Sequence, residues 1–157
     1  LVRGCAPAQV SLIHVYEYVG GTPMSETQDP DPFILGLFDR WNRALQSGDP
    51  NAVAACYDPG AVLLPTVSNE PRRTPAAIAE YFAHFLKLHP VGRIVDATVH
   101  RLCPDAAVFS GLYTFEVDGP GGRVDVPARF TFVYQRSPEG WRILEHHSSG
   151  MPEVPAA

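Results

Sequence analysis

Two adjacent histidines near the end of the chain, His146 and His147, are the residues best suited to chemistry. An imidazole changes its charge near neutral pH, so a histidine beside a substrate can act as a general base. Glu145 lies two positions before His147, on the same face of an extended chain, where its carboxylate could orient the imidazole and raise its pKa. His147 with Glu145 is therefore a candidate catalytic pair. A hydrogen-bonded structural histidine and an interface salt bridge are the alternatives.

The histidines lie on the second strand of a predicted hairpin. Apolar residues occupy every second position from 124 to 134, which is the period of a strand with one buried face. Residues 137–140, Ser-Pro-Glu-Gly, are typical of a turn, and an extended run restarts at Trp141. Neighbouring strand residues face opposite sides, so only one histidine can enter an interior, and the two cannot share one metal ion.

Two registers of this hairpin place different histidines inside. A hairpin with a four-residue loop and no bulge places Glu145 and His147 beside Phe132 and Phe130. A one-residue bulge instead places His146 on that face, because a single slip inverts the strand. The sequence leaves both registers open.

Further candidate ligand-binding residues are aromatic. Tyr57, Tyr81 and Tyr113 could direct hydroxyl groups into a cavity, with Phe130 as part of its wall and His146 as a polar contact. Aromatic residues at these spacings also suit a packed core, which is the alternative interpretation.

Polar candidates lie on a strand and ahead of a helix. Arg129 faces away from Phe130, where it could either form an interface ion pair with Asp125 or anchor an anion through its planar fork of donors. Asn69, followed by Arg72 and Arg73, precedes a predicted helix start and could bind a carboxylate or phosphate at a pocket mouth. A solvated turn is the alternative for this segment.

The composition limits the classes of protein. A chain of 157 residues with 45% hydrophobic and 18% charged residues suits one globular domain, and its net charge of −5 argues against nucleic-acid binding. No apolar run is long enough to span a membrane. Cys5, Cys56 and Cys103 are widely spaced, so neither a disulfide framework nor a zinc site is expected, and a reducing cytoplasm is predicted. No cofactor is expected.

Three helices are indicated by a capping residue followed by proline, at Asp31-Pro32, Asp49-Pro50 and Thr74-Pro75. Strands are predicted at 61–65, 93–102 and 107–115 and in the final hairpin, and residues 68–73 form a further short strand or a loop. The order predicts an α+β fold, a curved antiparallel sheet wrapped around three N-terminal helices. Residues 1–30 are expected to be an extension outside the core fold, which covers 31–153 and leaves 154–157 as a tail.

The segment FDRWNRALQSGDPNAVAACYDPGAVLLP, with ARFTFVY and WRILEHHSSGMP later in the chain, resembles the NTF2-like (cone-fold) superfamily. The last two segments are most similar to the association (hub) domain of calcium/calmodulin-dependent protein kinase II and to its bacterial SgcJ/EcaC-like and DUF4440-type relatives. This resemblance implies a conical pocket between helices and sheet, and homodimers or rings of dimers formed through the outer sheet face. The hub's two pocket arginines correspond to Phe132 and Ser148 here, so its route to a carboxylate does not transfer.

The sequence and the resemblance together predict a soluble, cytoplasmic, homo-oligomeric domain that binds a small, partly apolar molecule, with carboxylates among the candidates. One alternative is an isomerase, cyclase or dehydratase with a pocket histidine as general base. Another is a pure oligomerisation module. Neither nucleic acid nor a membrane is an expected partner.

Overall fold

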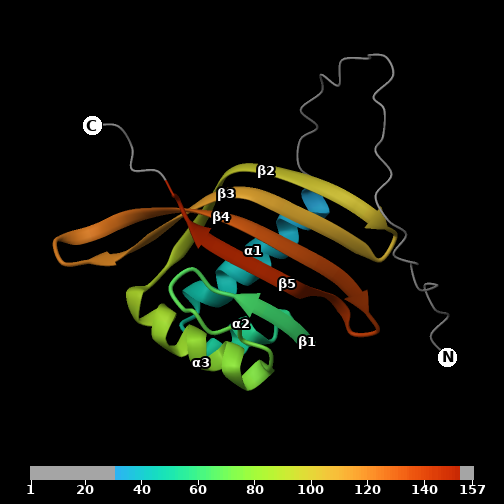
Figure 1. Cartoon of the computed structure of the whole chain (residues 1–157), viewed down its shortest axis with the longest axis horizontal. Coiled ribbons are helices and arrows are strands. Elements are labelled where there is room, and N and C mark those ends of the chain that lie inside the picture. The colour runs from blue at the N-terminus through green and yellow to red at the C-terminus, as the bar shows by residue number, and fades with distance from the viewer. Residues whose placement is uncertain (1–30, 153–157) are drawn as a thin grey trace, which may run out of the picture.

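The computed structural model describes residues 31–152 (Figure 1). The predicted extension at 1–30 and the tail at 154–157 lie outside the described residues. Within the described part no helix is long and apolar enough to cross a membrane.

The three helices begin at the predicted caps, as α1 (Pro32–Gln46), α2 (Pro50–Ala54) and α3 (Pro75–Phe85). The Phe33 N–H donates to Asp31 Oδ1 at 2.9 Å, and each helix has proline in its first turn, where no N–H partner is needed. Gly48 follows α1 with a φ of +72°, a left-handed conformation that ends the helix. A 3₁₀ turn, Leu86–Leu88, continues α3.

Five strands form one sheet, with the order β1-β5-β4-β3-β2. They are β1 (Tyr57–Leu64), β2 (Val91–Cys103), β3 (Ala106–Gly119), β4 (Gly122–Ser137) and β5 (Gly140–Gly150). The sheet is antiparallel except that β1 pairs with β5 in parallel. The strand predicted at 61–65 begins four residues earlier, at Tyr57, and the segment 68–73 contributes only a single bridge between Leu63 and Arg72.

A bulge in β2 bends the sheet where this strand pairs with β3. The register shifts between Ile94 and Asp96, and Gly111 pairs with Ala97 directly beside this bulge. A Cβ at Gly111 would lie 2.0 Å from the Asp96 carbonyl oxygen, so the two backbones approach closely at this point. Bulges increase the local twist and bend a strand, and this one contributes to the curvature around the helices.

Helix α1 lies across the concave face of the sheet, which we call the inner face (Figure 1). Its buried stripe is Ile34, Leu37, Phe38, Trp41 and Leu45. The Trp41 ring packs on Phe132 of β4 at a centroid distance of 5.4 Å, and Phe38 contacts the same ring at 6.3 Å. The α+β architecture predicted from the sequence is confirmed, and its core lies between α1 and the inner face.

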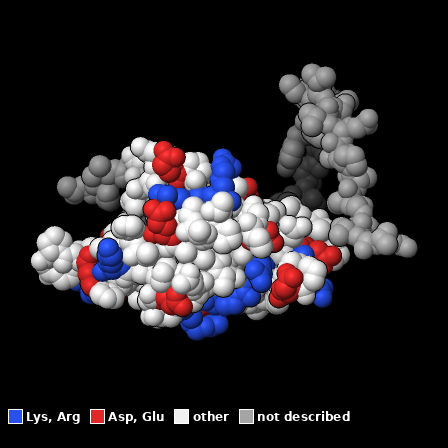
Figure 2. Space-filling view, turned by 90° about the horizontal axis from the view of Figure 1, so that it is seen from below, with Lys and Arg blue, Asp and Glu red and all other residues white. Residues whose placement is uncertain are grey.

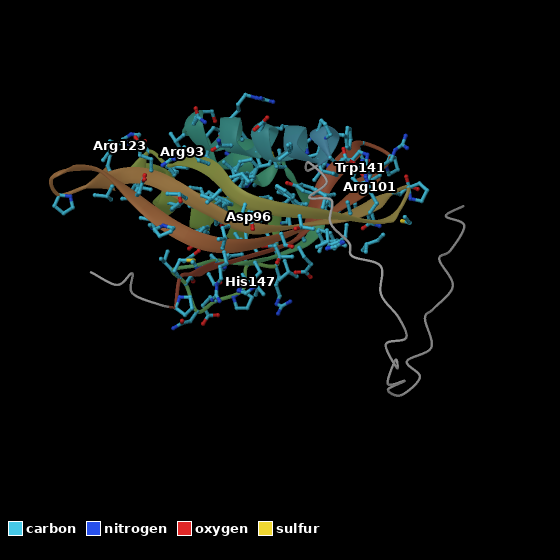
Figure 3. The ribbon with its side chains drawn as sticks, turned by 90° about the horizontal axis from the view of Figure 1, so that it is seen from above. Arg93, Asp96, Arg101, Arg123, Trp141 and His147 are labelled. Atoms are coloured by element: carbon cyan, nitrogen blue, oxygen red, sulfur yellow. The ribbon has the colours of Figure 1, made fainter. Side chains whose placement is uncertain are left out.

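An electrostatic contact fixes the start of α1. Arg101 donates to Asp31 Oδ2 from Nη2 at 2.6 Å and lies 5.4 Å from the ring centre of Trp141. Figure 3 shows Arg101 and Trp141 together at one end of the sheet. The cap of α1 is therefore also attached to β2, so the helix is positioned by its end as well as by its apolar stripe.

Charges are dispersed over the surface shown in Figure 2. Lys and Arg side chains alternate there with Asp and Glu, and much of the face is uncharged. This face therefore offers no extended basic surface of the kind that phosphate backbones need.

Candidate functional site

The β4–β5 register decides which histidine enters the fold. Tyr134 pairs with Ile143, whereas Val133 pairs with Glu145, so Leu144 is an extra residue in β5. The bulged register is therefore the one adopted. It pairs His146 with Phe132 on the inner face, where His146 is only 3% exposed.

The same bulge carries His147 and Glu145 to the outer face, where both are exposed. Figure 3 shows His147 on the side of the sheet away from α1. The unbulged register, the alternative that would place the candidate catalytic pair His147 and Glu145 in the interior, is wrong, because the extra residue inverts β5 from Glu145 onward.

A chain of buried hydrogen bonds holds His146. Trp41 Nε1 donates to Tyr57 Oη at 3.1 Å, and Tyr57 Oη lies 2.8 Å from His146 Nδ1. The imidazole also stacks on Phe132, with ring centroids 4.1 Å apart. Helix α1, strand β1 and strand β4 thus fix the position and tilt of a single side chain of β5.

The protonation state of His146 follows from this environment. Burial lowers the pKa of His146 to about 3, with a smaller contribution from the nearby His147, so the imidazole is neutral at ordinary pH. Burial raises the pKa of Tyr57 well above its ordinary value, so its hydroxyl keeps its proton. Tyr57 Oη accepts from Trp41, and within residues 31–152 its other hydrogen-bond partner is His146 Nδ1, so the Tyr57 proton is assigned to that bond.

The tautomer of His146 therefore carries its proton on Nε2. This N–H is buried and has no hydrogen-bond partner among the described residues. An unpaired buried donor costs free energy, and such groups in a folded protein call for an explanation.

His146 is part of the wall of a cavity of about 160 Å³ between the helices and the sheet. The cavity is lined mainly by apolar and aromatic side chains, and no Asp, Glu, Lys or Arg is among them. Its lining residues are Trp41, Leu63, Pro65, Thr66, Val67, Tyr81, Phe82, Phe85, Leu88, Tyr113, Phe115, Val117, Val126, Ala128, His146 and Ser148.

A second polar feature of the wall is a group of three hydroxyls. Tyr113 donates to Ser148 Oγ at 2.5 Å, and Ser148 is also hydrogen bonded to Thr66. Burial raises the pKa of Tyr113, so this hydroxyl remains protonated. The cavity thus has a mainly apolar wall with two polar features, the Nε2–H of His146 and the three hydrogen-bonded hydroxyls.

The family model for the calcium/calmodulin dependent protein kinase II association domain matches residues 32–152. The chain belongs to this family. A protein from Xanthomonas campestris described as such an association domain is 44% identical, over 89% of this chain and 100% of its own, with a TM-score of 0.77. No curated protein matches the chain.

More distant structures share the fold of this association domain. An NTF2-like protein with a cystatin-like fold from Novosphingobium aromaticivorans is 19% identical over 79% of this chain and 83% of that one, with a TM-score of 0.65. A protein from Streptomyces avermitilis described as a dehydratase of the NTF2-like family is 16% identical over 76% and 95%, with a TM-score of 0.66. The resemblance to the NTF2-like superfamily drawn from the sequence is confirmed.

The predicted aromatic residues lie in or near the cavity of the association domain. Tyr81 and Tyr113 line it. Tyr57 does not line it but is hydrogen bonded to the lining residue His146. Phe130 belongs to the core beneath Tyr113, with a centroid distance of 4.8 Å, and does not line the cavity. Ligand contact by Tyr81, Tyr113 and His146 remains a prediction.

Two predicted polar residues lie elsewhere. Arg129 is exposed on the outer face, where its Nε donates to Ser149 Oγ at 3.2 Å. Within the described residues Asp125 does not pair with Arg129 but binds Arg93 of β2 at 2.9 Å, across the intervening strand β3. An interface role for Arg129 remains a prediction. Asn69 is exposed and lines neither the cavity nor the space at its mouth.

Sequence reasoning missed part of the polar wall. Ser148 lies two positions from His146 on the same strand face, so the bulged register places both inside, but its hydrogen bonds to Tyr113 and Thr66 could not be predicted. Thr66 lies in the loop that follows β1, and no sequence pattern indicated that its hydroxyl would reach the cavity. Among residues 31–152, no three His, Cys, Asp or Glu side chains gather as a metal site would require.

Proposed function

We propose that this association domain binds a small, predominantly apolar, uncharged molecular group in the cavity between α3 and the sheet, and holds it by a hydrogen bond from His146 Nε2–H. The observation that carries the proposal is that His146, in the wall of a predominantly apolar cavity, has a buried N–H without a partner among residues 31–152. Ligand sites are typically apolar with a few placed polar groups, and this cavity has that character.

The size of the cavity limits the bound group. A volume of about 160 Å³ is close to that of an engineered cavity of roughly 150 Å³ that accepts benzene. A single six-membered ring with a carbonyl or ether oxygen therefore fits best. The oxygen would accept the His146 N–H, and the ring would contact aromatic walls such as Phe82 and Phe115.

The absence of charge among the lining residues excludes an ion from the deepest part of the cavity. A carboxylate buried without a cation is costly, and the neutral His146 does not supply one. The low pKa of His146 also makes it a poor general base, since an efficient base titrates near the working pH. Binding is therefore better supported than isomerase, cyclase or dehydratase chemistry.

Binding of acetophenone and ethylbenzene, which differ by a carbonyl group, tests this proposal by ligand-observed NMR titration. The wild-type protein should prefer acetophenone by about three- to tenfold, the equivalent of one net neutral hydrogen bond. His146→Phe should abolish the preference and keep the affinity for ethylbenzene. Ala128→Leu, which adds bulk to the cavity wall, should weaken both probes. If wild type binds neither probe, the proposal fails.

We also infer that the chain self-associates, as the name of its family describes, through the outer face of the sheet. Leu112 and Val133 are only half-buried on this face, and a self-complementary contact would cover them. Light scattering at micromolar concentration should give at least a dimer, and Leu112→Glu should reduce the mass to that of a monomer. Leu102→Glu, at the end of β2, is the matched control. A monomeric wild-type protein would overturn this inference.

A further inference from the structure

The segment between β1 and α3 brings an arginine to the inner side of the sheet. Leu63 and Arg72 form an antiparallel bridge with two backbone hydrogen bonds of 2.8 and 2.9 Å. Directly opposed residues of such a pair project their side chains to the same face. Leu63 is 1% exposed and lines the cavity, so Arg72 extends from the same side of the sheet.

The guanidinium of Arg72 is only partly satisfied. Its Nη2 donates to Ser68 Oγ at 3.3 Å, while its Nε is buried without a hydrogen-bond partner among the described residues. None of the ion pairs within residues 31–152 includes Arg72. A guanidinium presents a rigid fork of donors that matches a carboxylate. Within residues 31–152 no Asp or Glu carboxylate pairs with the Arg72 guanidinium.

Arg72 lines a second, more open cavity of about 390 Å³. This cavity adjoins the first, because four residues line both: Val67, Tyr81, Phe85 and Leu88. The other polar groups around Arg72 are Ser68, Glu80, Tyr81 and His84. Glu80 is exposed and His84 is bonded to the Glu80 carbonyl, so neither neutralises the arginine.

We propose that the second cavity is the anion subsite of the ligand site and that the ligand is an amphiphilic carboxylate. Its uncharged ring occupies the inner cavity, and its carboxylate pairs with Arg72 at the mouth. Arg72 carries one positive charge, which a carboxylate matches, whereas a doubly charged phosphate would leave a negative charge uncompensated near Glu80. The inference rests on the proposed function, since it assigns the charged end of a ligand whose apolar end that function describes.

Two probes of nearly equal shape test the assignment. They are 4-oxo-4-phenylbutanoate and its neutral amide, which both carry a phenyl ring and a ketone but differ in charge. Isothermal titration should show that wild type binds the carboxylate about ten- to a hundredfold more tightly, as a charge-assisted hydrogen bond at a partly buried site would give. Arg72→Gln should remove this preference and leave the affinity for the amide unchanged.

Arg73→Gln is the matched control, because Arg73 is exposed and lines neither cavity, and it should retain the preference. Arg72→Lys should keep part of it, and a thermal melt establishes that each variant is folded. Equal binding of the two probes by wild type, or an unchanged preference in Arg72→Gln, would overturn the anion subsite while leaving the proposed function in place. If neither probe binds, the proposed function and this inference are both overturned.

Discussion

Removing the hydroxyl of Tyr57 should destabilise the fold far more than its size suggests. This oxygen accepts from Trp41 Nε1 at 3.1 Å and lies 2.8 Å from His146 Nδ1 in a fully buried site. Tyr57→Phe leaves the ring packing but deprives both partners of their hydrogen bond. Each buried polar group left unpaired costs about 1–3 kcal/mol, so the free energy of unfolding should fall by about 2–4 kcal/mol once partial relaxation is allowed.

Tyr134 provides the matched control. It is as deeply buried as Tyr57, at 0% against 2% exposed, but its hydroxyl has no hydrogen-bond partner in residues 31–152. Tyr134→Phe should therefore be neutral or stabilising. Urea unfolding followed by tryptophan fluorescence gives both values, provided that the denaturant slope is unchanged. A Tyr57→Phe variant within about 0.5 kcal/mol of wild type, or one no less stable than Tyr134→Phe, would refute the hydrogen-bond argument, since changes of that size are typical of uninvolved positions.

Three further predictions concern protonation, backbone contact and capping. Because the folded pKa of His146 is about 3 and its ordinary value 6.5, the unfolded chain binds a proton first as pH falls, and stability is lost through that window. Between pH 7 and 4.5 wild type should lose about 2–3 kcal/mol more than His146→Phe in urea unfolding, and equal losses would contradict the buried neutral imidazole. Gly111→Ala should cost roughly 3 kcal/mol or more, because its Cβ would meet a β2 carbonyl at 2.0 Å. Gly121→Ala, with open space around it, should change the thermal midpoint little, and similar shifts would argue against the close approach. Asp31→Ala should cost about 1 kcal/mol by removing the α1 cap, whereas Asp31→Asn, which keeps an acceptor but not the charge facing Arg101, should cost less in the same unfolding assay.

The helices could be predicted because their signals are local. Asp31, Asp49 and Thr74 each accept a hydrogen bond from a backbone N–H two or three residues later. The proline that follows each cap has its φ angle fixed near the helical value. The start of β1 could not be found in this way. Asp58-Pro59-Gly60 has the composition of a turn, yet it lies in the irregular part of β1, between the pairings of Tyr57 and Val62 with β5. Parallel pairing with a strand about 80 residues later leaves no local trace.

The site could be predicted only in outline for the same reason. Alternation along β3 and β4 correctly indicates that Tyr113 and Phe130 share a face, because no register shift interrupts the pairing of these strands. The choice between His146 and His147 depended on one extra residue, Leu144, whose bulge becomes visible only in the pairing of β5 with β4. Arg72 reaches the cavity mouth through a single bridge to Leu63, which no pattern within its own segment indicated.

The groups that define the site also explain why a ligand should stabilise the fold. The inner face of β5 carries His146 and Ser148 where an ordinary core would have apolar side chains, and Trp41, Tyr57 and Tyr113 satisfy most of the resulting hydrogen-bond demand. The His146 Nε2–H has no partner within residues 31–152, so an acceptor on the proposed ligand would remove the cost of an unpaired buried donor. Binding to the folded state alone adds about 2.7 kcal/mol to stability when the ligand is present at a hundred times its dissociation constant. Under the proposed function, the polarity of this cavity wall is the protein's contribution to a complex with its ligand.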